Sequence, residues 1–106
     1  MLVVSRFRVS AGEADEFRGH LETARTLLAA CAGYVEGTAG RNVDDPELWV
    51  LFTRWRDVGS YRRALSSYDV KLGAVPLLSR AIDEPSAFEP VVPGEALNTR
   101  GSRSLG

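Results

Sequence analysis

Apolar residues mark three extended segments in the first half of the chain. Residues 2–9 alternate with a period of two and are rich in valine and phenylalanine, which predicts a strand. Residues 34–41 predict a second strand, weakened by two glycines, and the apolar run at residues 48–55 predicts a third. Turn-forming residues at 42–46 separate the second and third segments, so we expect these two strands to form a hairpin.

The spacing of apolar residues changes to that of a helix between the first two strands. Ser10 and Glu13 have the spacing of a capping box, in which each side chain accepts a hydrogen bond from the backbone amide of the other. Gly33 can adopt a left-handed conformation and is expected to end the helix. One apolar stripe follows from the spacing of Phe17, Leu21, Ala24, Leu28 and Cys31.

The second half of the chain predicts two further helical stretches. The first covers residues 60–67, with either Asp57 or Ser60 as its cap. The second covers residues 70–81, and Pro76 is expected to kink it or to begin its second turn.

A last strand is predicted at residues 86–92, where Pro90 favours an edge position because a missing amide costs least there. The order of elements is therefore βαββαβ. This order predicts a ferredoxin-like α+β fold, with both helical segments on one face of a four-stranded antiparallel sheet. We expect one domain over residues 1–92 and a flexible, polar tail over residues 93–106.

Two of the predicted strands are apolar on both faces, although helices can cover only one face. An uncovered apolar sheet face favours association, so the sequence predicts a homodimer in which two copies pack sheet against sheet. Alternation directs Arg6 and Arg54 toward that interface. We expect structural ion pairs there, with Glu36 or Glu89 of either chain as partner, and an anion site is the alternative. The residues concerned are Val3, Phe7, Leu2 and Val4 in the first strand, and Trp49, Leu51, Leu48, Val50 and Phe52 in the third.

Charge and composition exclude several classes of function. A net charge of −1 over 106 residues gives no basic surface for nucleic acid, and no apolar run is long enough to span a membrane. The arginines near the N-terminus interrupt any signal-peptide core, so we expect a cytoplasmic protein. The single cysteine, Cys31, is interpreted as a small core residue, with an activated thiol as the alternative. The carboxylates at 44–47 are interpreted as turn residues, and no metal site is predicted.

Three aromatic residues gather around the end of the third strand and the helix that follows it. Trp55, Tyr61 and Tyr68 either wall a pocket for a flat aromatic ligand or pack the seam between helix and sheet. His20 is the only histidine of the chain. It is either a general base, because its ordinary pKa suits proton removal near neutral pH, or a partly exposed boundary residue.

The segment LWVLFTRWRDVGSY, within a pattern that extends from Leu2 to Val92, resembles the antibiotic biosynthesis monooxygenase family of dimeric α/β-barrel proteins. Cofactor-independent anthrone and quinol oxygenases of this family look most similar. The resemblance implies that Trp55 and Tyr61 match the family's wall tryptophan and helix tyrosine. The family's strand asparagine falls on Leu51 and its later arginine falls near Val75, so half of that polar set is replaced.

The heme-degrading branch of the family has an asparagine, a tryptophan and a histidine where this chain has Ser5, Ala64 and, approximately, Ala74, so no heme and no other cofactor is expected. The resemblance implies oxidation of a small aromatic or polyketide-like molecule by O₂. The alternative is a non-catalytic dimer that binds a small hydrophobic molecule or acts as an accessory protein. The candidate catalytic residues are His20, Tyr61 and Tyr68, and the candidate substrate-binding residues are Ser5, Phe7, Leu51, Trp55 and Tyr61.

Overall fold

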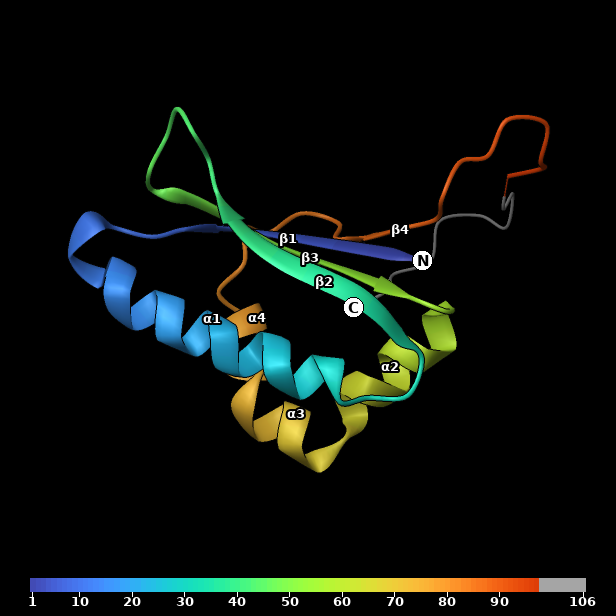
Figure 1. Ribbon diagram of the computed structural model, residues 1–106, viewed down its shortest axis with the longest axis horizontal. Coiled ribbons are helices and arrows are strands. Elements are labelled where there is room, and N and C mark those ends of the chain that lie inside the picture. The colour runs from blue at the N-terminus through green and yellow to red at the C-terminus, as the bar shows by residue number, and fades with distance from the viewer. Residues whose placement is uncertain (98–106) are drawn as a thin grey trace.

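A computed structural model describes residues 1–97 as a four-stranded antiparallel sheet with all helices on one of its faces (Figure 1). The strands lie in the order β2-β3-β1-β4, which places β1 and β3 in the centre. The predicted ferredoxin-like α+β fold is thereby confirmed. Its elements are β1 (Leu2–Arg8), a 3-10 turn (Ala11–Glu13), α1 (Ala14–Ala29), β2 (Tyr34–Arg41), β3 (Leu48–Trp55), α2 (Val58–Ser66), α3 (Tyr68–Gly73), α4 (Val75–Leu78) and β4 (Ala87–Phe88).

Strands β1, β2 and β3 form where the sequence predicted them, and β2 and β3 form the predicted hairpin. The turn between these strands is fixed by Asn42, whose side-chain oxygen accepts hydrogen bonds from the amides of Asp44 (2.9 Å) and Asp45 (2.8 Å). Such a side chain replaces the backbone partners that a turn leaves without hydrogen bonds. The acidic residues of this loop are therefore held as turn residues.

The start of α1 differs from the prediction. The Ser10 side chain makes no capping hydrogen bond, so the expected capping box is wrong. The amide of Glu13 donates instead to the backbone carbonyl of Ser10 (3.0 Å), which closes a 3-10 turn, and α1 begins only at Ala14. Downstream, Gly33 takes a left-handed conformation (φ 87°), as expected, and redirects the chain into β2.

The helical region after β3 is divided into three short helices. Asp57 caps α2, since its carboxylate accepts a hydrogen bond from the Ser60 amide (2.7 Å). The stretch predicted at residues 70–81 is two helices, α3 and α4, and the break lies at Ala74, where φ is −122°. Pro76 stands in the first turn of α4, where its missing amide costs no helical hydrogen bond.

Strand β4 is much shorter than the seven residues predicted. Only Ala87 and Phe88 pair with β1, because Pro85 before them and Pro90 after them remove the amides that a longer ladder requires. The predicted edge position is confirmed. The tail predicted at residues 93–106 lies largely outside the described residues, so its boundary remains a prediction.

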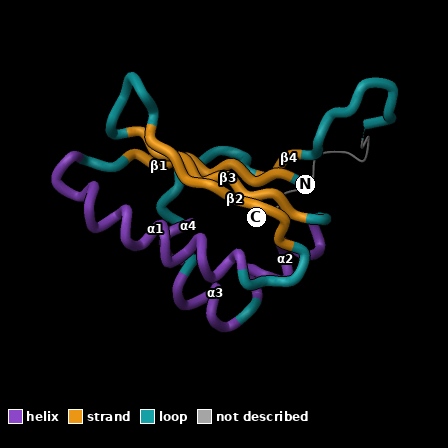
Figure 2. Tube along the Cα trace, viewed as in Figure 1, coloured by secondary structure: helices purple, strands orange, loops and turns teal. Residues whose placement is uncertain are grey.

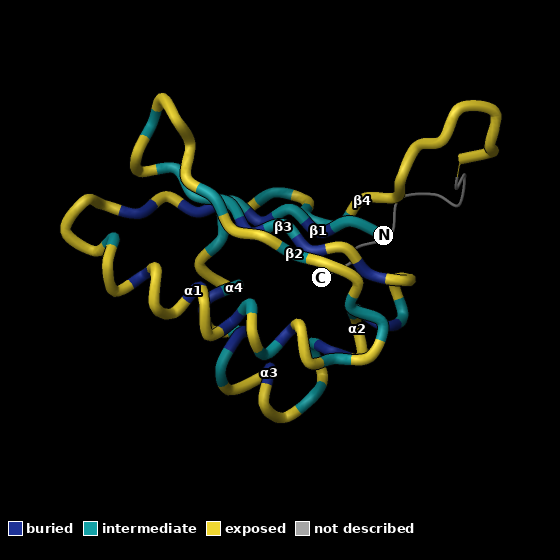
Figure 3. Tube along the Cα trace, in the orientation of Figure 1, coloured by how far each residue is buried: buried dark blue, intermediate teal, exposed yellow. Residues whose placement is uncertain are grey.

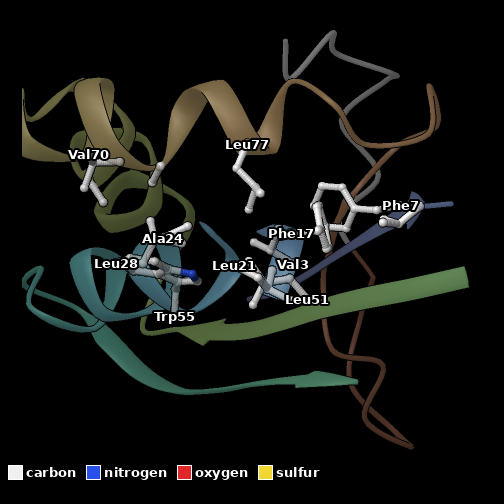
Figure 4. Packing of buried hydrophobic residues seen from close by; sticks show 13 residues of the cluster. Val3, Phe7, Phe17, Leu21, Ala24, Leu28, Leu51, Trp55, Val70 and Leu77 are labelled. Atoms are coloured by element: carbon white, nitrogen blue, oxygen red, sulfur yellow. The ribbon is translucent and has the colours of Figure 1, made fainter. Parts of the chain in front are cut away.

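The core lies between the sheet and the helices, where buried residues follow the inner sides of β1, β3 and α1 (Figure 3). Trp55 lies near Ala24 and Leu28, while Val70 and Leu77 enter the same cluster from the helices on its other side (Figure 4). Of the five residues predicted for the apolar stripe, Phe17, Leu21, Ala24 and Leu28 are buried, whereas Cys31 lies beyond the end of α1 and is only partly buried.

The opposite face of the sheet carries no helix (Figure 2). Its strand positions on β1 and β3 alternate with the buried ones; the apolar side chains among them are partly exposed within one chain, whereas Arg8 and Arg54 are exposed. The apolar members of this open face are Leu2, Val4, Leu48, Val50 and Phe52, together with Phe88 of β4.

Candidate functional site

The edge of the sheet beside β1 is interrupted opposite Ser5. On one side of the interruption the amide of Val4 donates to the carbonyl of Ser86 (2.7 Å), and on the other the amide of Ile82 donates to the carbonyl of Arg6 (2.8 Å). Between these two bonds, β1 has a single residue whereas the opposing chain has residues 83–85. The three extra residues loop away from β1, as in an enlarged β-bulge, and leave a gap in the sheet.

This gap belongs to a cleft of about 360 Å³. Alternation along β1 places Ser5 on the helix side of the sheet and Val4 and Arg6 on the open face. All three line the cleft together with Tyr61 of α2, so the cleft lies at the edge of the sheet, beside both the helix layer and the open face. Its remaining lining residues are Leu78, Ser79, Ala81, Ile82, Asp83, Glu84 and Ser86.

Tyr61 is held at the cleft by the end of β3. Its ring lies 5.4 Å from the ring of Trp55, with an interplanar angle of 54°. Trp55 is only 1% exposed and is fixed from its other side by the Tyr34 ring, at 5.4 Å and nearly perpendicular. The indole N–H of Trp55 donates to the hydroxyl of Thr53 (2.8 Å). Trp55 therefore supports Tyr61 from within the core, and the lining of the cleft does not include it.

Burial raises the pKa of the Tyr61 hydroxyl, because removing the phenolate from water disfavours the charged form. The hydroxyl consequently keeps its proton to a higher pH than an exposed tyrosine. At neutral pH it can donate a hydrogen bond to an oxygen atom of a ligand in the cleft.

An ion pair spans the outer mouth of the cleft. Both oxygens of Glu84 accept from the guanidinium of Arg6, at 2.6 and 2.8 Å, and this bonding holds the pKa of Glu84 below its ordinary value. Arg54 pairs with Glu36, one of the two partners expected for these arginines. Within one chain Arg6 pairs with Glu84, which was not among the expected partners; Glu84 lies in the loop at residues 83–85, which leaves the sheet opposite Ser5.

The structure brings only Ser5 and Tyr61 of the predicted site residues together in this cleft. Phe7 (1% exposed) and Leu51 (2% exposed) lie in the core beneath the sheet. His20 lines a separate hollow on α1, and Tyr68, which is 76% exposed, lines another beside the end of α1. Neither His20 nor Tyr68 lines the cleft that contains Tyr61.

Sequence reasoning missed the polar residues that the loop contributes, namely Asp83, Ser79 and Ser86. A run of Asp-Glu-Pro between a helix and a strand has the composition of an ordinary solvated turn. The available signal was Pro85, directly before the predicted strand, because a proline there interrupts the pairing with β1.

Two features are absent from residues 1–97. No three His, Cys, Asp or Glu side chains of this part of the chain converge as metal ligands. In the same residues, no helix has the length and apolar character needed to cross a membrane.

The chain was compared with proteins of known sequence and structure. A search of curated proteins gave no match. Among solved structures, SnoaB, a cofactor-independent oxygenase from Streptomyces nogalater, shares 25% identity at a TM-score of 0.70, over 89% of this chain and 96% of its own. A conserved protein from Methanosarcina mazei Go1 shares 22% identity at a TM-score of 0.67, over 81% of this chain and 84% of its own. Rv0793 from Mycobacterium tuberculosis shares 18% identity at a TM-score of 0.68, over 89% of this chain and 97% of its own.

The last two similarities concern the fold alone, since fewer than one residue in four is identical. A sequence profile supplies the family. The profile described as antibiotic biosynthesis monooxygenase matches residues 1–73, which include β1, α1, the hairpin, α2 and Tyr61. Because this match covers more than half of the chain, the protein belongs to the antibiotic biosynthesis monooxygenase family.

Proposed function

We propose that this protein is a cofactor-independent monooxygenase that oxidises a small aromatic molecule with O₂ in the cleft beside Tyr61. Membership of the family and similarity to a cofactor-independent oxygenase support this reaction class. The observation that carries the proposal is the place of Tyr61, which lines the cleft together with Ser5 and packs against the buried ring of Trp55. Burial raises the pKa of its hydroxyl, which favours the protonated form that donates a hydrogen bond.

The reaction proposed is the conversion of an activated CH₂ group to a ketone. Loss of a proton gives an electron-rich carbanion, whose negative charge is shared with the oxygen of the aromatic system. This anion transfers electrons to O₂, one oxygen atom forms a new bond to the carbon, and the other leaves as water. For anthrone, one molecule of substrate and one of O₂ give anthraquinone and water.

The residues of the cleft supply the groups that such a reaction requires. Tyr61, and beside it Ser5, donate hydrogen bonds to the oxygen on which negative charge develops, which lowers the barrier if the donors are already in place. Glu84 is engaged by Arg6, so the carboxylate of Asp83 is the acceptor that we assign to the leaving proton. His20 and Tyr68, which lie in other hollows, have no part in this proposal.

The test is oxygen consumption with anthrone by the Tyr61→Phe variant. This change removes one hydroxyl and keeps the ring that packs on Trp55, so we expect kcat/KM to fall roughly 10- to 100-fold, as for the loss of a donor to a developing charge. Tyr68→Phe is the matched control and is expected to retain full activity, since Tyr68 is exposed elsewhere. Equal rates in both variants and the unaltered protein would refute the assigned role of Tyr61.

A second function is favoured by one observation. Leu51, at the position where the resemblance implies a strand asparagine, is an apolar core residue that is 2% exposed. A chain lacking that polar group can still bind a small aromatic molecule without turnover. In this case anthrone analogues bind in the cleft and are displaced by competitors, yet the oxygen electrode shows no consumption above the rate in buffer.

We also propose that the protein is a homodimer whose copies pack through the open face of the sheet. The apolar centre of that face is formed by Val4, Val50 and Phe52, and the pairs Arg6–Glu84 and Arg54–Glu36 lie beside it. An apolar sheet face packed on an equivalent face removes both from water, at about 25 cal/mol per Å² of apolar surface.

Substitution of Phe52 by aspartate is expected to abolish the dimer, because it would place a charge in the centre of an apolar interface. Sedimentation equilibrium at micromolar concentration should give twice the chain mass for the unaltered protein and the chain mass for Phe52→Asp. Val43→Asp, in the hairpin loop where Val43 is 95% exposed, should remain dimeric. A monomeric unaltered protein would exclude this interface.

A further inference from the structure

A second concave surface lies on the other side of the molecule, between α1 and the edge strand β2. It is a groove of about 540 Å³, within the range of sites for small organic molecules. In Figure 1, α1 runs below β2 along this side of the sheet. The groove is lined by Ala14, Asp15, Arg18, Leu21, Glu22, Ala39, Gly40, Arg41 and Trp49, none of which lines the cleft beside Tyr61.

Trp49 contributes an unusual feature to this groove. Among the buried side-chain nitrogen and oxygen atoms of residues 1–97, its indole Nε1 is the one that has no hydrogen-bond partner. A buried donor without an acceptor is rare and costs free energy, because the hydrogen bond it would make to water has been lost. Trp55 differs, because its indole N–H donates to Thr53 at 2.8 Å. The fold thus provides a hydrogen-bond acceptor for the indole of one tryptophan and none for that of the other.

The charges around the groove favour an anion. No carboxylate of the described residues lies within ion-pairing distance of Arg18 or Arg41. Glu22 is already engaged, since both of its oxygens accept from Arg25, at 2.6 and 3.0 Å. The guanidinium of Arg41 lies over the Trp49 ring, 5.7 Å from the ring centre. Among the described residues that line the groove, two guanidinium groups and one carboxylate, that of Asp15, therefore have no ion-pair partner.

The apolar part of the wall is suited to a flat ring. Leu21 is buried at its base, and Ala39 and Gly40 of β2 leave the edge of the sheet without bulky side chains. The nitrogen of Trp49 is closed to solvent, so an acceptor reaches it only when a covering side chain moves. Long arginine side chains move at low cost, and an anion attracts both of those that stand at this groove.

We propose that this groove is a binding site for a small aromatic carboxylate, separate from the oxygenase cleft. The aromatic ring lies against Leu21 and the small residues of β2. Its carboxylate draws Arg18 and Arg41 toward itself, and one carboxylate oxygen accepts the hydrogen bond from the Trp49 indole. The ligand thus supplies the acceptor that the folded chain lacks.

The experiment is a titration of the full-length ¹⁵N-labelled protein with 1-naphthoate, followed through the two indole N–H signals in a proton–nitrogen correlation spectrum. The Trp49 signal is expected to shift downfield and to saturate, whereas the Trp55 signal, held by Thr53, should stay in place. Absence of a saturable Trp49 shift at millimolar naphthoate, or equal shifts of both signals, would overturn the proposal. Turnover is not required, so this result is independent of the oxygenase function.

Matched variants assign the contributions of single groups. Arg41→Gln is expected to weaken naphthoate binding about tenfold, as for the loss of a charged hydrogen-bond donor. Trp49→Phe, measured by calorimetry, should weaken it similarly while keeping an aromatic ring. Arg62→Gln, an exposed change on α2, should leave the affinity unchanged. The neutral analogue 1-naphthalenemethanol should bind at least about tenfold more weakly than naphthoate; equal affinities would show that the arginines select no anion.

Discussion

Replacing Trp55 by alanine is expected to lower the free energy of unfolding by about 3–5 kcal/mol, the range observed when a large aromatic side chain is removed from a core. Trp55 is 1% exposed, packs between the rings of Tyr34 and Tyr61, and uses its indole N–H on Thr53. Alanine would lose all of these contacts and leave a cavity under α2. It would also leave the buried Thr53 hydroxyl without the hydrogen bond from the indole. Small domains have a total stability of about 5–15 kcal/mol, so this change threatens the fold itself.

Urea unfolding followed by circular dichroism measures the loss of free energy. In thermal unfolding, the midpoint of the variant should be lower by roughly 15 °C or more. Val43→Ala, at a loop position that is 95% exposed, is the control and should unfold like the unaltered protein. A loss below about 1 kcal/mol for Trp55→Ala would mean that Trp55 is not the packed residue described here. Any activity lost in Trp55→Ala thus reports on folding, and Tyr61→Phe is the variant that addresses catalysis.

Gly33→Ala is expected to destabilise the protein by about 2–5 kcal/mol for two separate reasons. The φ of Gly33 is +87°, a conformation that alanine adopts only with strain. A Cβ atom there would also stand 2.3 Å from both the Cβ and the Oγ of Ser60. Ser60 is 1% exposed and lies in the first turn of α2, so neither its backbone nor its side chain has space to withdraw.

Gly94 offers a control that separates the two causes. It has nearly the same φ, +85°, but no atom lies within 4 Å of the position that its Cβ would take. Gly94→Ala should therefore cost no more than the conformational strain, about 1–2 kcal/mol. Chemical unfolding of both variants gives the steric part as the difference between them. If the two losses are equal, the contact between residue 33 and Ser60 does not constrain the fold.

The first three strands were predictable because their signal is local. Strand β1 follows from a period-two alternation and β3 from a continuous apolar run, and both patterns are visible in the sequence without knowledge of the partner strand. The same holds for the hairpin, whose turn depends on Asn42 and its immediate neighbours. Glycine at position 33 marked the end of the first helical region for an equally local reason, its tolerance of positive φ.

The cleft was not predictable because it depends on how β1 and the end of the chain pair across a large sequence separation. Ser5 was expected to contribute to a site, but nothing near it in the sequence indicates that residues 83–85 leave the sheet opposite it. The same loop determines the partner of Arg6. Alternation correctly placed Arg6 on the open face, whereas the identity of its carboxylate followed from tertiary structure.

The candidate acid–base residues show the limit of reasoning from residue type. His20 was selected for its chemistry, and Tyr68 for its position after an aromatic motif. The structure places each in its own hollow, apart from Tyr61. The groove beside Trp49 is a related case, since an indole N–H without an acceptor is recognised only when every neighbouring atom is known.

The gap opposite Ser5 gives the cleft an outer mouth on the open face of the sheet, guarded by Arg6 and Glu84. A second copy packed on that face would close this side of the cleft. A bound molecule could then leave only on the helix side. The residence time of a ligand would then depend on protein concentration, being long where dimers predominate and short after dilution into monomers. In such a dimer, the three residues that interrupt the sheet would make the rate of ligand release depend on the state of assembly.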